Sequence, residues 1–237
     1  MPETVSLFGA QISLYYLFWF LGIIYALILG VLLAKDYGLT FAKAIVYVSV
    51  ALVLGYLIIW ITSWIFGGGK VQGFNLVRSV AFLPALYWAL SRLFKKPYTE
   101  FSDFLAPVGV SGFGIIRIGC IFTGCCQGYP SHWGLYSNIA ETKCFPIQPI
   151  EAAVSLIIGA ILFVMAKKKI QQGKLLCWMM IMFGSTRFVL EFFRDNNKLF
   201  LNISELAIHA LVTLIVGLIV LIVLTKQDNK RRANEKD

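Results

Sequence analysis

The chain has 237 residues, of which 59% are hydrophobic and 14% are charged. Soluble domains carry about 25% charged residues, so this composition excludes an ordinary water-soluble globule and favours a protein whose apolar exterior lies in lipid. The formal net charge of +9 is concentrated in short basic clusters, which we interpret as topology signals of a membrane protein and not as a nucleic-acid-binding surface.

Seven apolar stretches follow one another along the chain, each close to the roughly 20 residues that a helix needs to cross a bilayer. They cover residues 14–33, 44–66, 76–93, 104–122, 149–165, 176–193 and 208–224. The segment before the first stretch contains Glu3 and no basic residue, so we read that stretch as a retained helix and not as a secretory signal. The prediction is an all-α, polytopic membrane helical bundle of about seven transmembrane helices.

Basic residues follow the first, third, fifth and seventh stretches, whereas the loops between the other stretches contain few lysines. The basic residues are Lys35, Lys43, Lys95, Lys96, Lys167, Lys168, Lys169, Lys226, Lys230, Arg231, Arg232 and Lys236. Because positive loops stay in the cytoplasm, we predict the N-terminus outside and the C-terminus inside, as in a multi-pass protein of the inner (cytoplasmic) membrane. Residues 1–225 would form one transmembrane domain, and residues 226–237 a basic cytoplasmic tail.

The fourth and sixth stretches carry charged residues at membrane depth, where an unpaired charge costs several kcal/mol. Arg117 lies in the fourth, and Arg187, Glu191 and Arg194 recur at spacings of four and three on one face of the sixth. A self-neutralising stripe would account for Glu191 but leaves arginines in excess. We therefore predict an anion site between these helices, and a phospholipid phosphate is the anion that guanidinium groups match there.

Four of the five cysteines lie around the loop that follows the fourth stretch: Cys120, Cys125, Cys126 and Cys144. Adjacent cysteines do not readily ligate one zinc ion, and only His132 is nearby, so a metal site is the weakest interpretation. The others are a disulfide such as Cys126 with Cys144, a nucleophilic thiolate activated by neighbouring arginines, and packing of small apolar side chains. All of these stay open at this point.

Several motifs in this order resemble those of the prolipoprotein diacylglyceryl transferases, from about residue 9 to the end of the seventh stretch. They are Leu14-Tyr15-Tyr16, Ser102-Asp103-Phe104-Leu105-Ala106-Pro107, Arg117-Ile118-Gly119, Pro146-Ile147-Gln148-Pro149-Ile150-Glu151-Ala152 and Gly184-Ser185-Thr186-Arg187-Phe188-Val189-Leu190-Glu191-Phe192-Phe193-Arg194. The family is similar in topology, with about seven helices and an external N-terminus.

The resemblance implies an enzyme that moves the diacylglyceryl group from phosphatidylglycerol to the thiol of a cysteine in a secreted precursor protein, releasing glycerol phosphate. Arg117 and Arg187 match the family's arginines that hold the phosphate and its developing charge. The residues expected to bind substrate are Tyr16, Arg78, Gly119, Gly124, Gln148, Glu191 and Arg194. The expected partners are the phospholipid, a protein acceptor with a thiol, and the bilayer, with no cofactor.

The chain departs from the family's pattern at residues that handle protons. Val77-Arg78-Ser79 replaces a His-Gly-Gly element, and Cys120 and Cys125 stand for an asparagine and a glutamate. We therefore predict Cys120, Cys125 and Glu151, with the two arginines, as catalytic residues, one of the thiols acting as a nucleophile. The alternatives are a catalytically silent phospholipid-binding or scaffold protein, and a membrane thiol oxidoreductase that uses Cys125 and Cys126.

Overall fold

The computed structural model describes residues 4–7, 10–68, 76–137, 139–195, 198–200 and 203–234. Lys236 of the predicted tail lies outside these residues. The described helices are α1 (Leu14–Ala34), η1 (Lys35–Tyr37, a short 3-10 helix), α2 (Phe41–Phe66), α3 (Val77–Val80), α4 (Leu83–Leu93), α5 (Tyr98–Thr123), α6 (Ile147–Lys167), α7 (Leu175–Glu191) and α8 (Glu205–Asn234). The described strands form three antiparallel hairpins, β1 (Thr4–Leu7) with β2 (Ala10–Ser13), β3 (Pro130–Ser137) with β4 (Thr142–Cys144), and β5 (Lys198–Phe200) with β6 (Ile203–Ser204).

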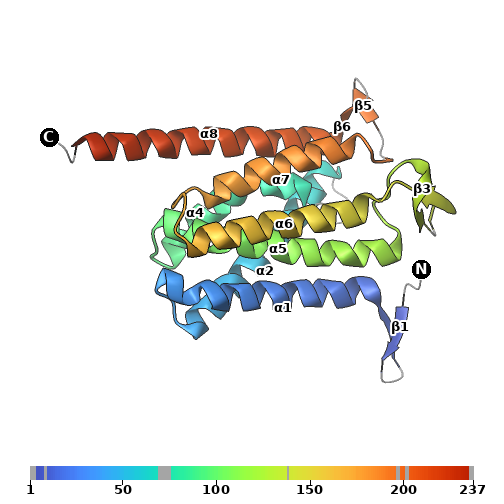
Figure 1. Ribbon diagram of the computed structural model, residues 1–237, viewed down its shortest axis with the longest axis horizontal. Coiled ribbons are helices and arrows are strands. Elements are labelled where there is room, and N and C mark those ends of the chain that lie inside the picture. Colours follow the sequence, from blue (N-terminus) through green and yellow to red (C-terminus); the bar gives the residue numbers. More distant parts are fainter. Residues whose placement is uncertain are drawn as a thin grey trace.

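The long helices lie side by side, and the three hairpins gather at one end of the bundle (Figure 1). Helix α5 packs against α1 on one side and α6 on the other, while α7 packs against α8. The end of α5, the start of α6, the end of α7 and the start of α8 therefore all lie at the hairpin end. This arrangement brings together the loops that carry the cysteines and most of the charged residues within the apolar stretches.

Five of the described helical segments are long and apolar enough to cross a bilayer: Leu14–Tyr37, Phe41–Phe66, Tyr98–Thr123, Ile147–Lys167 and Glu205–Arg231. The protein is thus a multi-pass, mostly helical membrane protein, as the sequence predicts. The third predicted stretch is divided into α3 and α4, and α7 has 17 residues. The predicted count of about seven crossings and the predicted orientation of the termini stay predictions.

The break between α3 and α4 has a local cause. Pro84 lies in the first turn of α4, where its missing N–H costs no helical hydrogen bond. In the interior of one continuous helix, the same proline would remove a backbone hydrogen bond and its ring would clash with the preceding turn. Residues 76–93 therefore form two short helices joined at a bend.

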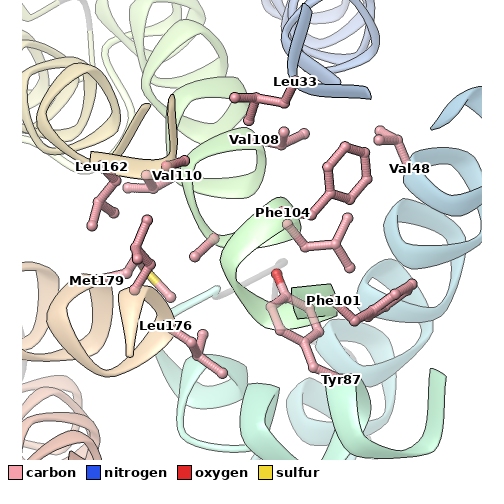
Figure 2. Packing of buried hydrophobic residues seen from close by; sticks show 14 of the residues in the cluster. Leu33, Val48, Tyr87, Phe101, Phe104, Val108, Val110, Leu162, Leu176 and Met179 are labelled. Atoms are coloured by element: carbon pink, nitrogen blue, oxygen red, sulfur yellow. The ribbon is translucent and has the colours of Figure 1, made fainter. Parts of the chain in front are cut away.

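The apolar core is centred on α5, whose side chains pack on two sides. Figure 2 shows Phe104 next to Val48 of α2, while Val110 faces Leu162 of α6 and Met179 of α7. Both Phe104 and Leu162 are almost completely buried. Because lipid tails are as apolar as these side chains, close van der Waals packing and not the hydrophobic effect is what holds α5 at the centre of the bundle.

A buried carboxylate fixes the start of α7 against α5. Asp103 accepts hydrogen bonds from the backbone N–H groups of Gly173 (2.5 Å) and Leu175 (2.9 Å). The first turn of a helix has N–H groups with no intrahelical partner, and a carboxylate satisfies them while favouring the positive end of the helix dipole. The Ser102-Asp103-Phe104 motif thereby sets the position of α7, the helix that carries Arg187.

The glycines near Arg117 allow α5 to lie close to α1. A Cβ atom on Gly119 would lie 3.1 Å from Phe18 and 3.2 Å from the backbone of Tyr15, and one on Gly112 would lie 3.1 Å from the carbonyl oxygen of Gly22. Small residues of this kind are what permit tight helix packing in membranes. The two glycines therefore hold α1 and α5 in direct contact.

Candidate active site

Three helices bring two arginines onto one carboxylate at the hairpin end of the bundle. Arg117 of α5 places Nη2 at 2.9 Å from Oε2 of Glu151 in the first turns of α6, and Arg187 of α7 places Nη1 at 2.5 Å from Oε1. Arg117 also donates from Nη2 to Oε1 of Glu151 at 3.1 Å. Glu151 is therefore a bridge between guanidinium groups that lie 34 and 36 residues away from it in the chain.

A second carboxylate, that of Glu191, extends these contacts along α7. The contacts form one charged network of Arg117, Arg187, Arg194, Glu151 and Glu191. Arg187 Nη2 lies 2.9 Å from Oε2 of Glu191, and Arg194 Nη1 lies 3.7 Å from the same oxygen. Ser204, just before α8, donates to Oε1 of Glu191 at 3.0 Å and also accepts the backbone N–H of Ala207. The predicted stripe of Arg187, Glu191 and Arg194 is thus a set of real contacts, and it ties the end of α7 to the start of α8.

The network is buried and carries an excess of positive charge. Arg187 is 1% exposed, Glu151 3%, Arg194 3% and Glu191 4%. With Arg117 included, three arginines face two glutamates, which leaves one positive charge when all five groups are ionised. A buried charge without a counter-ion is strongly unfavourable, so this surplus fits a site that takes up an anion.

Some donors of the network also point to an additional ligand. The Nε atoms of Arg117, Arg187 and Arg194 are buried and have no hydrogen-bond partner among the residues that the structure describes. Buried polar groups in proteins nearly always have a partner. Guanidinium groups bind phosphate through parallel N–H donors, which is the chemistry that these unpaired atoms would satisfy.

An apolar cavity of about 350 Å³ lies next to the network, between α1, α2, α3, α4 and α5. Phe113 and Ile116 line it, and the guanidinium group of Arg117 lies 5.1 Å from the centre of the Phe113 ring. The cavity therefore ends close to Arg117. A charged group beside a lined apolar space matches the two parts of a phospholipid, a headgroup phosphate and acyl chains.

The segment from Cys120 to Cys126, called the cysteine segment below, folds back over the end of α5. Gly124 ends the helix with a left-handed φ of 67°, and Cys126 also has a left-handed φ, of 61°. Gln148 Nε2 donates to the carbonyl oxygen of Cys125 at 2.8 Å, and Arg194 Nη2 donates to that of Cys126 at 3.4 Å. The network and the cysteine segment are thus parts of one site.

The chain was compared with known proteins. A sequence model of the family described as prolipoprotein diacylglyceryl transferase matches residues 2–224. The chain belongs to the prolipoprotein diacylglyceryl transferase family.

Three curated relatives are named phosphatidylglycerol–prolipoprotein diacylglyceryl transferase. The one from Nitrosomonas europaea is 30% identical over 146 residues, which cover 60% of this chain and 51% of the relative. The one from Clostridium perfringens, named transferase 2, is 25% identical over 58% of this chain and 56% of the relative, and the one from Paracidovorax citrulli is 28% identical over 81% and 70%. The chain spans about half the length of the first two relatives.

Of the two cysteines that replace the expected asparagine and glutamate in this member of the family, Cys120 contacts Arg117, whereas Cys125 contacts Thr123. Arg117 Nη1 donates to Sγ of Cys120 at 3.5 Å, and Thr123 Oγ1 donates to Sγ of Cys125 at 3.2 Å. All five cysteines are free, Cys126 being exposed and Cys144 buried. The Cys126–Cys144 disulfide, one of the interpretations that the sequence left open, is therefore not formed in this structure.

The loop thiols differ in acidity. The Cys125 thiol donates a hydrogen bond to Cys126, and Arg117 lies nearby, so the pKa of Cys126 is lowered to about 6. Interaction with the thiols of Cys120 and Cys126, together with burial, raises the pKa of Cys125 above its usual range. Of the two loop thiols, Cys126 is therefore the more acidic, whereas the sequence prediction named Cys120 and Cys125 as the candidate nucleophiles.

The other predicted substrate-binding residues have contacts of a different kind. Tyr16 is 61% exposed on the outside of α1, whereas its neighbour Tyr15 lies against Gly119. Arg78 of α3 forms a two-point ion pair with Glu205 of α8, with Nε and Nη2 each 3.0 Å from a carboxylate oxygen. Gly119 and Gly124 shape the backbone, through close packing and through the left-handed end of α5.

Sequence reasoning missed two residues of α8. His209 Nε2 lies 3.4 Å from Oε1 of Glu205, and its ring packs on Phe66 at 4.6 Å between centroids. The signal available was Ser204, an N-cap residue type that marks the start of a helix just before Glu205. A start there places Glu205 and His209, four residues apart, on one face.

Proposed function

We propose that the chain is a membrane-embedded transferase that moves a diacylglyceryl group from phosphatidylglycerol to the thiol of a protein acceptor at the outer face of the membrane. The observation that carries the proposal is the buried, net positive bridge of Arg117, Glu151 and Arg187 at the end of an apolar cavity. The names of the relatives, which contain phosphatidylglycerol and prolipoprotein, agree with it.

The charge of the network suits the proposed donor lipid. A phosphodiester such as the one in phosphatidylglycerol carries one negative charge, and the three arginines and two glutamates of the network together leave one positive charge. Arg117 and Arg187 would hold the phosphate with donors that include their unpaired Nε atoms. The cavity beside Phe113 and Ile116 would hold part of an acyl chain.

The reaction balances if Glu151 accepts the proton of the acceptor thiol. The sulfur attacks the glyceryl carbon that bears the phosphate, a carbon–sulfur bond forms, the carbon–oxygen bond breaks, and glycerol phosphate leaves. A phosphate monoester carries almost two negative charges at neutral pH. Protonation of Glu151 raises the network from +1 to +2, so the site stabilises the leaving group as its charge increases.

Cys120 and Cys125 are proposed to act in the same site. Cys120 would orient the guanidinium of Arg117 by accepting its hydrogen bond. For acyl transfer, either thiol would accept the acyl group as a thioester that a second nucleophile can remove. A glyceryl thioether on either cysteine would be too stable to pass on. The direct attack by the acceptor thiol is therefore the proposed route for the diacylglyceryl group.

We also propose seven crossings, with the N-terminus outside, in the inner (cytoplasmic) membrane. Two shorter crossings would be made by α3 with α4 and by α7, whose 17 residues span about 26 Å at 1.5 Å per residue, close to the bilayer core. All three hairpins would then lie on the outer side, in agreement with their position at one end of the bundle (Figure 1). Residues 1–225 would be one domain, followed by the cytoplasmic tail.

The test uses the purified chain in lipid nanodiscs with isotope-labelled phosphatidylglycerol and a cysteine peptide. We expect the mass of one diacylglyceryl group on the peptide thiol and release of glycerol phosphate. Arg187→Lys replaces the planar guanidinium, which contacts Glu151 and Glu191 through two different nitrogens, with a single ammonium group. We expect this variant to lose most of the transfer. The matched control is Arg92→Lys, because Arg92 lies on the Trp88 ring in the last turn of α4, away from the network.

Two other outcomes would contradict the proposal. Retention of phosphatidylglycerol without transfer to any acceptor would assign a lipid-binding or scaffold role. Oxidation of acceptor thiols to a disulfide, with reduction of a Cys125–Cys126 disulfide formed beforehand and no lipid transfer, would assign a thiol oxidoreductase.

A further inference from the structure

Three thiols are gathered at the end of α5. Cys120 lies in the last turns of the helix, 4% exposed, with its sulfur 3.5 Å from Nη1 of Arg117. Cys125 directly follows the left-handed turn at Gly124, and both Cys120 and Cys126 act on its thiol at short range. Cys126 is exposed at the surface. The cluster thus runs from solvent to the arginine that the proposed transferase uses for phosphate.

The backbone explains why Cys120 and Cys125 meet. A helix that ends on a left-handed glycine brings the residue after that glycine against the residue four positions before it. Gly124 is this glycine, so the pair in contact is Cys125 and Cys120. Bonds from Gln148 and Arg194 to the carbonyl groups of Cys125 and Cys126 hold the turn in this form.

We infer that Cys120 and Cys125 are a site of reversible disulfide formation that controls the transferase site in response to thiol-disulfide reagents outside the membrane. The inference rests on the proposed function for its consequence, but not for the chemistry of the pair. The oxidant is a low-molecular-weight disulfide such as oxidised glutathione. Two protein thiols and one such disulfide yield the Cys120–Cys125 disulfide and two small thiols, which carry away both protons and both electrons.

Exchange begins at the surface and moves inward. Cys126 is the accessible thiolate and attacks the reagent, forming a mixed disulfide and expelling one small thiol. Cys125 displaces the second small thiol, and Cys120 then attacks Cys125 and sets Cys126 free. An eight-membered ring between adjacent cysteines is less favourable than the wider ring of Cys120 and Cys125, so the exchange ends on the inner pair.

Oxidation alters the phosphate site through Arg117. The sulfur of Cys120 accepts a hydrogen bond from that guanidinium, and a disulfide sulfur is a poorer acceptor that is also turned toward Cys125. We expect the oxidised protein to transfer lipid about tenfold more slowly, the loss that follows from one hydrogen bond to a charged group. Reduction restores the rate.

The experiment exposes the full chain in nanodiscs to mixtures of oxidised and reduced glutathione. The first readout is mass spectrometry after alkylation of the remaining thiols, which identifies the joined peptides. The second is the transfer rate of the same samples. We expect a Cys120–Cys125 disulfide in the native protein. In Cys120→Ser the exchange should stop at the Cys125–Cys126 disulfide, and in Cys125→Ser it should stop at the mixed disulfide of Cys126 with glutathione. The matched controls are Cys144→Ser and Cys177→Ser, which should behave as the native protein.

The outcomes separate the two proposals. No Cys120–Cys125 disulfide at any glutathione ratio, or a disulfide that includes Cys144 instead, overturns the inference, because these results do not depend on activity. Formation of the predicted disulfide with an unchanged transfer rate overturns its regulatory part. The predicted disulfide in a protein that never transfers lipid, even when reduced, supports the thiol chemistry and contradicts the proposed function alone.

Discussion

Replacing Glu151 with glutamine tests the central bridge of the site. The side chain keeps its size, but a neutral amide now faces Arg117 and Arg187 in place of the carboxylate that lies 2.5–3.1 Å from their donors. The net charge of the network rises from +1 to +2. Only one oxygen is left to accept hydrogen bonds, and the amide N–H₂ group cannot pair with a guanidinium.

The structure sets the size of the expected effect on stability. Glu151 is 3% exposed, so its arginine partners lose a buried counter-ion. Removing one partner of a buried ion pair costs about 3–5 kcal/mol, and we expect the free energy of unfolding of Glu151→Gln to fall by about that amount. Phosphatidylglycerol at about 100 times its dissociation constant should restore about 2.7 kcal/mol, because an anion replaces the missing carboxylate.

The expected effect on catalysis is different for the two kinetic constants. Without its proton acceptor the variant should lose about 10²–10⁴-fold in kcat. Its KM for phosphatidylglycerol should not rise, because the additional positive charge favours the phosphodiester. The assay is lipid transfer in nanodiscs, together with unfolding followed by circular dichroism at several phosphatidylglycerol concentrations. Glu100→Gln is the matched control, since Glu100 is exposed at the opposite end of α5.

Two results would refute this reasoning. If KM rises while kcat is unchanged, Glu151 contributes only to binding and does not accept the proton. If the electrically neutral lipid phosphatidylcholine stabilises the variant as much as phosphatidylglycerol does, the surplus charge of the network does not select an anion.

Three further predictions concern the support of the site. Asp103→Ala leaves the N–H groups of Gly173 and Leu175 without an acceptor and should lower the free energy of unfolding by about 2–6 kcal/mol in detergent titration, at about 1–3 kcal/mol for each donor. Gly119→Ala forces α1 and α5 apart and should cost about 1–3 kcal/mol by the same measurement. Alkylation of Cys126 should reach half its maximal rate near pH 6, because the reactive thiolate forms above its pKa. A midpoint above pH 8 in Cys125→Ala, which removes the donor, would confirm that the Cys125 hydrogen bond is the cause, and an unshifted midpoint would contradict it.

The sequence determined the class of the protein and the members of its charged network. Runs of about 20 apolar residues are a local property, so the membrane helices could be predicted from composition alone. The same holds for Arg187, Glu191 and Arg194, because a helix repeats every 3.6 residues and places them on one face. Arg117 could be predicted because a charge at membrane depth needs a reason.

Only the tertiary structure decided which partners these residues have. Glu151 could not be assigned to Arg117 and Arg187 from spacing, since the three residues lie on different helices whose contacts depend on packing around α5. The pair of Arg78 and Glu205, separated by 127 residues, is of the same kind. The opposite orientation of the neighbours Tyr15 and Tyr16 depends on where α1 meets α5.

In the cysteine segment, the sequence and the tertiary structure each decide a different feature. The sequence determined that thiols cluster near an arginine, because Cys120, Cys125 and Cys126 are close in the chain. Their contacts were decided by the left-handed turn at Gly124, which reverses the backbone and lets both Cys120 and Cys126 act on the Cys125 thiol at short range. Local patterns specify which side chains are available, whereas long-range packing and backbone reversals decide which atoms meet.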